Sequence, residues 1–237
     1  MVDVDTFFTL SGKEFPSILI LGVFTLSFLV YWKIFSSSHG DTKKIVRARI
    51  SGAVLFGILP TSVFLLLTDY SFSDIGYVFV KGSGLLIVTA SIVLSLSAVV
   101  LNFFNARIPE NLIKYPQIRE KNWDKKLLLL NAVSWIVYII GYEMLFRGLL
   151  LFPLIDLMGI WPAVLVNVAL YSVTHIPKGL NEAVGAILLG IILCVLTILS
   201  GSIWIAVFVH IALGLSNTFL SLRNQKDMKI VFFKGKR

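Results

Sequence analysis

The sequence has little charge. Only 14% of its 237 residues are Asp, Glu, Lys or Arg, whereas soluble domains have about 25%. No polar stretch approaches the roughly 50 residues that a small soluble domain needs. The chain therefore has no room for a separate soluble catalytic domain.

Cysteine and several familiar motifs are scarce or missing. The single cysteine, Cys194, lies in an apolar run, so an intramolecular disulfide is impossible and the redox compartment is not indicated. We interpret it as a small packing residue. The sequence contains no CxxC pair, glycine-rich phosphate loop, internal repeat or low-complexity tract. The start lacks the basic leader of a secretory signal, because it has Asp3, Asp5 and Glu14 against Lys13. We therefore expect the first hydrophobic stretch to be retained as a spanning helix.

Hydrophobic residues are abundant, at 57% of the chain. Because a membrane-spanning helix needs about 20 apolar residues, this supply is enough for six or seven spans. The sequence predicts an all-α, polytopic membrane bundle, with six helices and one peripheral segment as the alternative to seven. By apolar run length the spans are Phe15–Phe35, Ile50–Leu67, Ser83–Phe104, Leu127–Leu151, Met158–His175, Ala183–Leu199 and Ile203–Leu220.

Basic residues test the number of spans, because cytoplasmic loops of membrane proteins collect Lys and Arg. With seven helices, 18 of the 21 basic residues lie on one side, while Lys13 lies opposite and Lys81 and Arg147 lie near or within helices. We therefore expect an outside N-terminus and a cytoplasmic C-terminus, in a protein that resides in the cell membrane. This placement accounts for the net charge of +8, so nucleic-acid binding is not expected.

These features divide the chain into four parts. We expect three N-terminal transmembrane helices over 1–105 and a basic cytoplasmic loop over 106–126. A core of four transmembrane helices over 127–221 and a basic cytoplasmic tail over 222–237 follow.

Ionisable residues within the spans are the candidate functional residues, because each costs about 2.5–3.5 kcal/mol at the centre of a spanning helix. Glu143 and Arg147 lie four residues apart, on one helical face. His175 ends the fifth helix and His210 lies in the seventh. A structural ion pair is the simplest interpretation of Glu143 and Arg147. However, two of the three histidines of the chain lie in the same half as this pair, which favours a functional site.

Polar neighbours extend this candidate site. In the fifth helix Asn167, Tyr171, Thr174 and His175 share one face, which must point into the bundle or a wet cavity. In the seventh, Asn217 lies almost two turns after His210, on the same face.

Two chemistries are open for these residues. A carboxylate and an imidazole can activate a water that attacks a peptide carbonyl, while a second imidazole or an amide stabilises the oxyanion. Alternatively, Glu143, His175 and His210 are ligands of a divalent metal such as zinc, with a fourth position open. Spacing does not separate the two, because the residues come from three helices and form no HExxH motif.

Three segments resemble the CPBP family of CAAX proteases and bacteriocin-processing enzymes, which includes the type II CAAX prenyl proteases. That family has the motifs EExxxR, FxxxH and HxxxN in consecutive membrane helices. Here the first is similar to Tyr142-Glu143-Met144-Leu145-Phe146-Arg147, the second to Tyr171-Ser172-Val173-Thr174-His175, and the third to His210-Ile211-Ala212-Leu213-Gly214. The segment 115–119 also resembles the family, and the whole resemblance covers about 115–220.

The resemblance implies an intramembrane peptidase with Glu143, His175 and His210 as catalytic residues. Arg147, Tyr142, Tyr171, Asn167 and Asn217 are the expected supporting residues. Two positions depart from the family pattern. Tyr142 stands where the family has the Glu that activates water, and Gly214 stands where it has an Asn.

Three functions follow as hypotheses. The first is an intramembrane endopeptidase that acts on a peptide or membrane-protein substrate, with Glu143 and His175 activating water and His210 stabilising the oxyanion or binding a metal. The second is a catalytically decayed membrane protein that acts as a scaffold or in bacteriocin self-immunity, as Tyr142 and Gly214 suggest. The third is a small transporter with Glu143 as a proton-coupled site. The expected partners are the lipid bilayer and that substrate, and the oligomeric state is not indicated.

Overall fold

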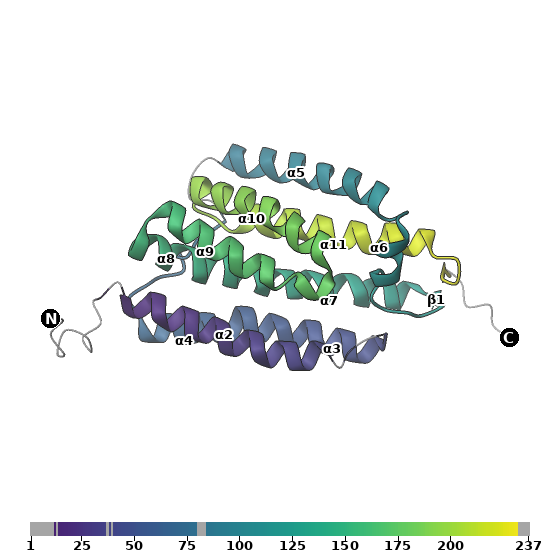
Figure 1. Cartoon of the computed structure of the whole chain (residues 1–237), viewed down its shortest axis with the longest axis horizontal. Helices are drawn as coiled ribbons and strands as arrows, with labels where there is room; N and C mark the ends of the chain where they lie inside the picture. Colours follow the sequence, from purple (N-terminus) through teal and green to yellow (C-terminus); the bar gives the residue numbers. More distant parts are fainter. Residues whose placement is uncertain (1–11, 13, 37, 39, 80–83, 232–237) are drawn as a thin grey trace.

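Long apolar helices dominate the computed structural model, which describes residues 12, 14–36, 38, 40–79 and 84–231 (Figure 1). Among these residues, seven helical segments are long and apolar enough to cross a membrane. They are α2 (Glu14–Ser36), α3–η1–α4 (Thr42–Ala53, Val54–Ile58, Leu59–Leu67), α5 (Gly84–Asn105), α7–η2–α8 (Lys125–Glu143, Met144–Leu150, Leu151–Met158), α9–η3 (Ile160–Val173, Ile176–Lys178), α10 (Leu180–Ser200) and α11 (Trp204–Asn224). The predicted all-α polytopic bundle is confirmed.

The second span begins earlier than the apolar pattern predicted, at Thr42 rather than Ile50. Asp41 caps it, since its side chain accepts a hydrogen bond from the Lys44 amide at 2.8 Å. The basic residues after this cap therefore lie on a helix, and Arg49 is buried, with 2% of its surface exposed. The predicted start at Ile50 left Arg49 outside the helix, which was wrong, because a run of apolar residues marks only the membrane-facing part of a helix.

The fourth span also extends beyond its predicted end, to Met158 rather than Leu151. A seven-residue π-helix, η2, lies in its middle, and a five-residue π-helix, η1, interrupts the second span. The wider turns of a π-helix change which residues share a face. A search for apolar residues at the α-helical period of 3.6 residues therefore does not detect a π-helix.

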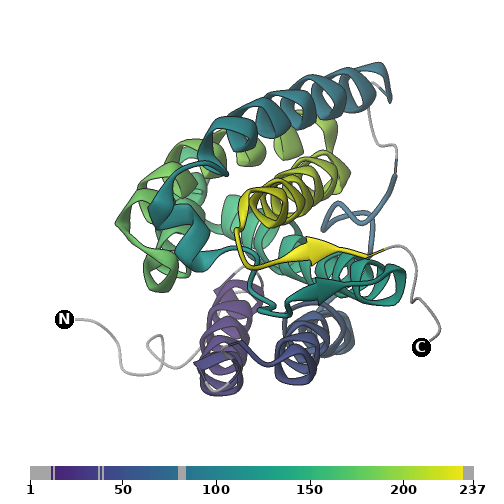
Figure 2. The ribbon, with the colours of Figure 1, turned by 90° about the vertical axis from the view of Figure 1, so that its right-hand side faces the viewer.

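The helices form layers around the α7–η2–α8 span. In Figure 1, α2, α3 and α4 lie on one side, α9 and α10 lie near the centre, and α5 lies on the other side. Helix α5 packs along α11, and α3 packs against α7, an arrangement also visible from the end of the bundle in Figure 2. N-terminal helices thus cover both sides of the helices that carry the candidate site residues.

Small residues allow η1 and α7 to cross closely. A Cβ atom added at Gly57 would lie 2.8 Å from the Gly141 Cα, and one added at Gly141 would lie 2.8 Å from the Ala53 Cα. This small-residue contact is a common way for membrane helices to approach. It fixes the position of α7 two residues before Glu143.

The two ends of the bundle differ in charge. The short helix α6 (Pro109–Lys114), the strand β1 (Asn122–Trp123) and its parallel partner β2 (Lys229–Ile230) gather at one end. Here lie described basic residues of the predicted cytoplasmic loops, including Lys114, Arg119, Lys125, Lys126, Lys226 and Lys229. The described residues of the opposite end include Asp69, Asp74 and Asp156. Lys13 and Lys81, which we assigned outside or near a helix, lie outside the described residues.

Candidate active site

A buried carboxylate with two partners forms the centre of the candidate site. Glu143, the last residue of α7, is fully buried. Its Oε1 lies 2.5 Å from His210 Nδ1 on α11, and its Oε2 lies 3.4 Å from Arg147 Nη1 in η2. His210 is 7% exposed and Arg147 is fully buried. The structure thus brings together residues of the first and third motif-like segments.

The π-helix η2 places Arg147 beneath the Tyr171 ring. The guanidinium carbon lies 4.1 Å from the ring centroid, a cation–π contact. None of the three guanidinium nitrogens has a hydrogen-bond partner among the described residues. The charge of Arg147 is therefore compensated by Glu143 and by the aromatic face of Tyr171.

Asn167 supports this π-helix rather than the reacting centre. Its amide donates to the Phe146 carbonyl at 2.6 Å, and its Oδ1 accepts from Cys194 Sγ at 3.3 Å. A carbonyl in a π-helix can lack its usual partner along the helix, and Asn167 satisfies it. Cys194 is free and buried, in agreement with its interpretation as a packing residue.

His175 is held by a second group of polar residues. The Tyr142 hydroxyl and Thr174 Oγ1 are 2.6 Å apart, and Thr174 Oγ1 donates to the Tyr171 carbonyl at 2.7 Å. Because the single Thr174 proton goes to this carbonyl, Tyr142 is the donor to Thr174. His175 Nδ1 lies 2.9 Å from the same carbonyl, so it bears the ring proton and Nε2 is left as an acceptor.

The two histidines flank Tyr142 without meeting at one point. The Tyr142 ring lies 5.6 Å from the His210 ring and 6.3 Å from the His175 ring, with an interplanar angle of 84° in each case. The His175 ring also contacts the Tyr171 ring, with the centroids 4.7 Å apart and the planes tilted by 44°. Tyr142 is therefore the link between the Glu143–His210 pair and His175.

The remaining expected residues lie elsewhere. Asn217 accepts from Asn111 Nδ2 at 3.1 Å and so faces α6. Gly214 lies against α7, where an added Cβ would be 3.2 Å from Ile139 Cδ1. An apolar side chain thus occupies the space beside the position at which the family has an Asn, and the structure does not bring Asn217 or Asn167 into that place.

The metal-ligand interpretation gains no geometric support. Over the part of the chain that the structure describes, no three His, Cys, Asp or Glu residues lie close enough together to hold a metal ion. Glu143 and His210 are adjacent, but Tyr142 separates them from His175. These residues therefore do not fit a three-ligand metal site, and we derive no step through a metal.

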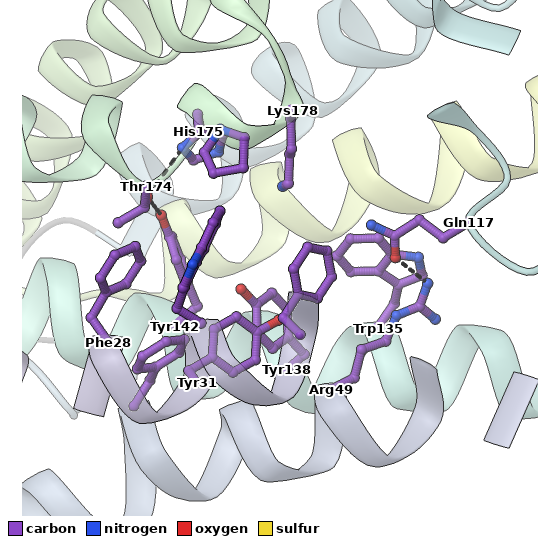
Figure 3. A pocket seen from close by; sticks show the side chains of 14 residues that line it. Phe28, Tyr31, Arg49, Gln117, Trp135, Tyr138, Tyr142, Thr174, His175 and Lys178 are labelled. Atoms are coloured by element: carbon purple, nitrogen blue, oxygen red, sulfur yellow. Dashed lines mark hydrogen bonds between the residues drawn. The ribbon is translucent and has the colours of Figure 1, made fainter. Parts of the chain in front are cut away.

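A narrow cavity of about 40 Å³, which we call the inner cavity, runs beside the site. Figure 3 shows Tyr142, Thr174 and His175 at one end and Arg49, Gln117 and Trp135 at the other. Its walls are largely aromatic, while Glu143 and His210 are not among its lining residues. Sequence reasoning missed the cavity residues Arg49 and Lys178 because both lie just outside the spans that apolar run length predicted.

These features define an integral multi-pass membrane protein with a buried Glu–Arg–His group inside its helical bundle. Residues 124–216 match the family model described as type II CAAX prenyl endopeptidase Rce1-like. The match includes Glu143, Arg147, His175 and His210, and confirms the resemblance to the CPBP and CAAX protease family over these residues. It supports an intramembrane protease function in general terms. No curated protein and no solved structure matches the chain.

Proposed function

We propose that the chain is an intramembrane endopeptidase that hydrolyses a peptide bond of a membrane-associated or peptide substrate. The observation that carries the proposal is the 2.5 Å contact between Glu143 and His210, from the first and third motif-like segments within the family match. A charged group inside a spanning helix is costly, so a site that holds one has functional meaning by default.

The hydrogen bonds suggest a role for each histidine. Glu143 accepts from His210 Nδ1 and the Tyr171 carbonyl accepts from His175 Nδ1. The Nε2 of His175 is therefore available as a proton acceptor, whereas the Nε2 of His210 becomes a donor when that ring is protonated; neither Nε2 has a partner among the described residues. Hydrolysis needs a base for the proton of the attacking water and an acid for the leaving amine.

We assign the water to the end of the inner cavity where His175 lies. In this proposal His175 Nε2 accepts the proton as the water oxygen attacks the carbonyl carbon. From across Tyr142, a protonated His210 would donate from Nε2 and stabilise the developing negative charge on the carbonyl oxygen, with Glu143 as its counter-ion and Arg147 orienting Glu143 through the ion pair. His175 then returns the proton to the leaving nitrogen.

Substitution tests this proposal in full-length protein reconstituted in liposomes with a library of quenched fluorescent peptides. We expect the wild type to cleave some of them, and Glu143→Gln, His175→Gln and His210→Gln each to lower the rate at least about 100-fold. Asn217→Ala is the matched control, because Asn217 lies on α11 but faces Asn111. Unchanged cleavage in Glu143→Gln and His210→Gln would refute the assignment.

The second candidate function is non-catalytic: the protein would act as a membrane scaffold or in bacteriocin self-immunity. It is favoured by Tyr142 and Gly214 at two family positions and by the absence of Glu143 and His210 from the described lining of the inner cavity. It predicts that protection against the antimicrobial peptide, or capture of a partner, survives His175→Gln combined with His210→Gln. Loss of that activity in the double variant would count against it.

We also propose that the basic end of the bundle faces the cytoplasm of the cell in whose membrane the protein resides. The 127–221 core then bears the site, and the preceding helices cover it on both sides. The argument is the gathering of basic loops at one end, since the cytoplasmic side collects Lys and Arg.

A further inference from the structure

A second, wider cavity of about 460 Å³, which we call the outer cavity, lies at the basic end of the bundle. Its lining includes the end of α2, the α6–β1 connection and η3. The connection contributes Tyr115, Gln117 and Arg119, part of the segment whose resemblance to the family the catalytic proposal leaves unexplained. The outer cavity therefore needs its own interpretation.

Three cations line the outer cavity, and no Asp or Glu is among its described lining residues. Lys178, at the end of η3, is half-buried, and its ammonium group has no hydrogen bond or ion pair with any described residue. Among the described residues, the Arg119 guanidinium donates only to the main-chain carbonyls of Leu112 and Ile113, and burial lowers its pKa. Lys114 is 3.7 Å from Glu182, its one carboxylate partner there. The cavity thus has a surplus of positive charge.

The inner cavity adds a further cation that has no carboxylate partner among the described residues. Arg49 donates to Asn131 Oδ1 at 3.0 Å, Ser134 Oγ at 3.1 Å and Gln117 Oε1 at 2.9 Å, all of them neutral acceptors. Arg147, by contrast, is also buried but has the Glu143 carboxylate beside it. Gln117 and Lys178 line both cavities, so Arg49 adds to the positive field at the outer one.

Exposed apolar side chains lie in or next to the segments that line the cavity. Ile113, Ile176 and Leu180 are 76%, 57% and 76% exposed. The cavity lies where the spanning helices α2 and α9–η3 end, the depth at which a spanning protein meets lipid headgroups. A ligand for this place needs a negative group for the cavity and an apolar part for the surface around it.

We propose that the outer cavity binds the phosphate headgroup of an anionic phospholipid, with Lys178, Arg119 and Lys114 as its charged partners. Basic cavities between membrane helices on the cytoplasmic side are suited to such headgroups. The volume of the outer cavity admits a phosphodiester with its two substituents, whereas the inner cavity is far smaller. A bound headgroup would lie over the connection to the inner cavity, because Phe35, Gln117, Pro177 and Lys178 line both.

The test uses the purified full-length protein in a neutral detergent, with phosphatidylglycerol and phosphatidylcholine as probes and native mass spectrometry as the measurement. We expect the wild type to bind phosphatidylglycerol more tightly than phosphatidylcholine. Lys178→Gln and Arg119→Gln should each weaken binding of phosphatidylglycerol about fivefold, the effect of one basic residue at a lipid surface. Lys125→Gln and Lys126→Gln are matched controls, since these exposed lysines lie at the same end but not in the cavity.

Four results would overturn the proposal. Equal binding of the two lipids by the wild type, a comparison that needs no variant to fold, would show that charge is not recognised. An equal loss in the lysine controls would show general attraction to the surface. Displacement of the lipid by inorganic phosphate would indicate a site for the free ion, and displacement by an apolar peptide with a free carboxylate would indicate a peptide site. The measurement is independent of proteolysis, so it separates this inference from the catalytic one.

Discussion

Glu143 combines two roles that sequence alone does not separate, the partner of Arg147 and the partner of His210. The family-like pattern placed all three residues in spans, and the structure brings them into contact. The ion pair lies at 0% side-chain exposure, where water provides no screening. A residue inside such a pair is needed for stability whether or not it takes part in chemistry.

The first prediction concerns this ion pair. Glu143→Gln leaves Arg147 charged and buried without a carboxylate, so we expect the free energy of unfolding to fall by about 3–5 kcal/mol. Glu143→Gln combined with Arg147→Met removes both charges and should recover part of that loss. The measurement is denaturant unfolding in detergent micelles, followed by helical circular dichroism. If the double variant is no more stable than Glu143→Gln, the pair does not have this energetic role.

The second prediction concerns the hydroxyl between Tyr142 and His175. Thr174→Val keeps the shape but removes the acceptor of the Tyr142 hydroxyl, which is left unpaired in a buried place. We expect a loss of about 1–3 kcal/mol in unfolding free energy and a lower cleavage rate, while Thr174→Ser should retain both. Equal behaviour of the Val and Ser variants would show that the hydrogen bond is unimportant.

Sequence reasoning identified the candidate site residues but not their grouping. Residue types and spacing identified Glu143, Arg147, His175 and His210, because ionisable groups in apolar helices are rare. It did not show that Tyr142 would separate His175 from Glu143, since that depends on the π-helix and on how α9 packs. Nor did it show that Asn217 faces α6, because a shared helical face does not say which neighbour it meets.

At the scale of the helices, π-helices and glycine contacts decide where the site lies. Apolar run length predicted the spans well, but it missed the start of the second span at Thr42 and the end of the fourth at Met158. Caps and wide turns are local hydrogen-bond features, and hydropathy does not report them. The crossing of η1 and α7 at Gly57 and Gly141 likewise depends on which faces meet.

The third prediction concerns this helix crossing. Gly141→Ala places a methyl group 2.8 Å from the Ala53 main chain, so the helices must separate near Glu143. We expect lower thermal stability and weaker cleavage. Gly185→Ala is the matched control, because Gly185 is an exposed helical glycine with open space around its Cα, and Ala is the better helix former by about 1 kcal/mol. The two variants can be compared by thermal unfolding, and similar melting temperatures would contradict the close contact.

At the scale of the whole molecule, hydropathy and charge were enough to predict the architecture. They predicted seven spans, which the structure confirms within the described residues. Hydropathy and charge did not predict that α5 packs along α11, away from α2, α3 and α4. Lipid-facing helices are apolar all round, so their sequences contain little information on which neighbour they choose.

The fourth prediction concerns membrane orientation. Lys226 lies at the basic end and Asp69 at the opposite end, and both are exposed. We expect a membrane-impermeant maleimide added to intact cells to label Asp69→Cys but not Lys226→Cys, and to label both once the cells are opened. The native Cys194 is buried, so the unsubstituted protein should remain unlabelled and is the control. The reverse labelling pattern would place the basic end outside.

The pairing of β1 with β2 joins two distant parts of the chain. Lys229 donates from its amide to the Lys121 carbonyl at 2.8 Å, and Val231 donates to the Trp123 carbonyl at 2.9 Å. Trp123 is fully buried beneath this pairing, among Ile45, Ile118 and Leu222. In a variant whose other four tryptophans are replaced by Phe, Trp123 is thus an optical reporter of the segment that leads into α7. Release of β2 by proteolysis would expose the indole to water and shift its emission to longer wavelength, which gives a way to follow this end of the protein without any added label.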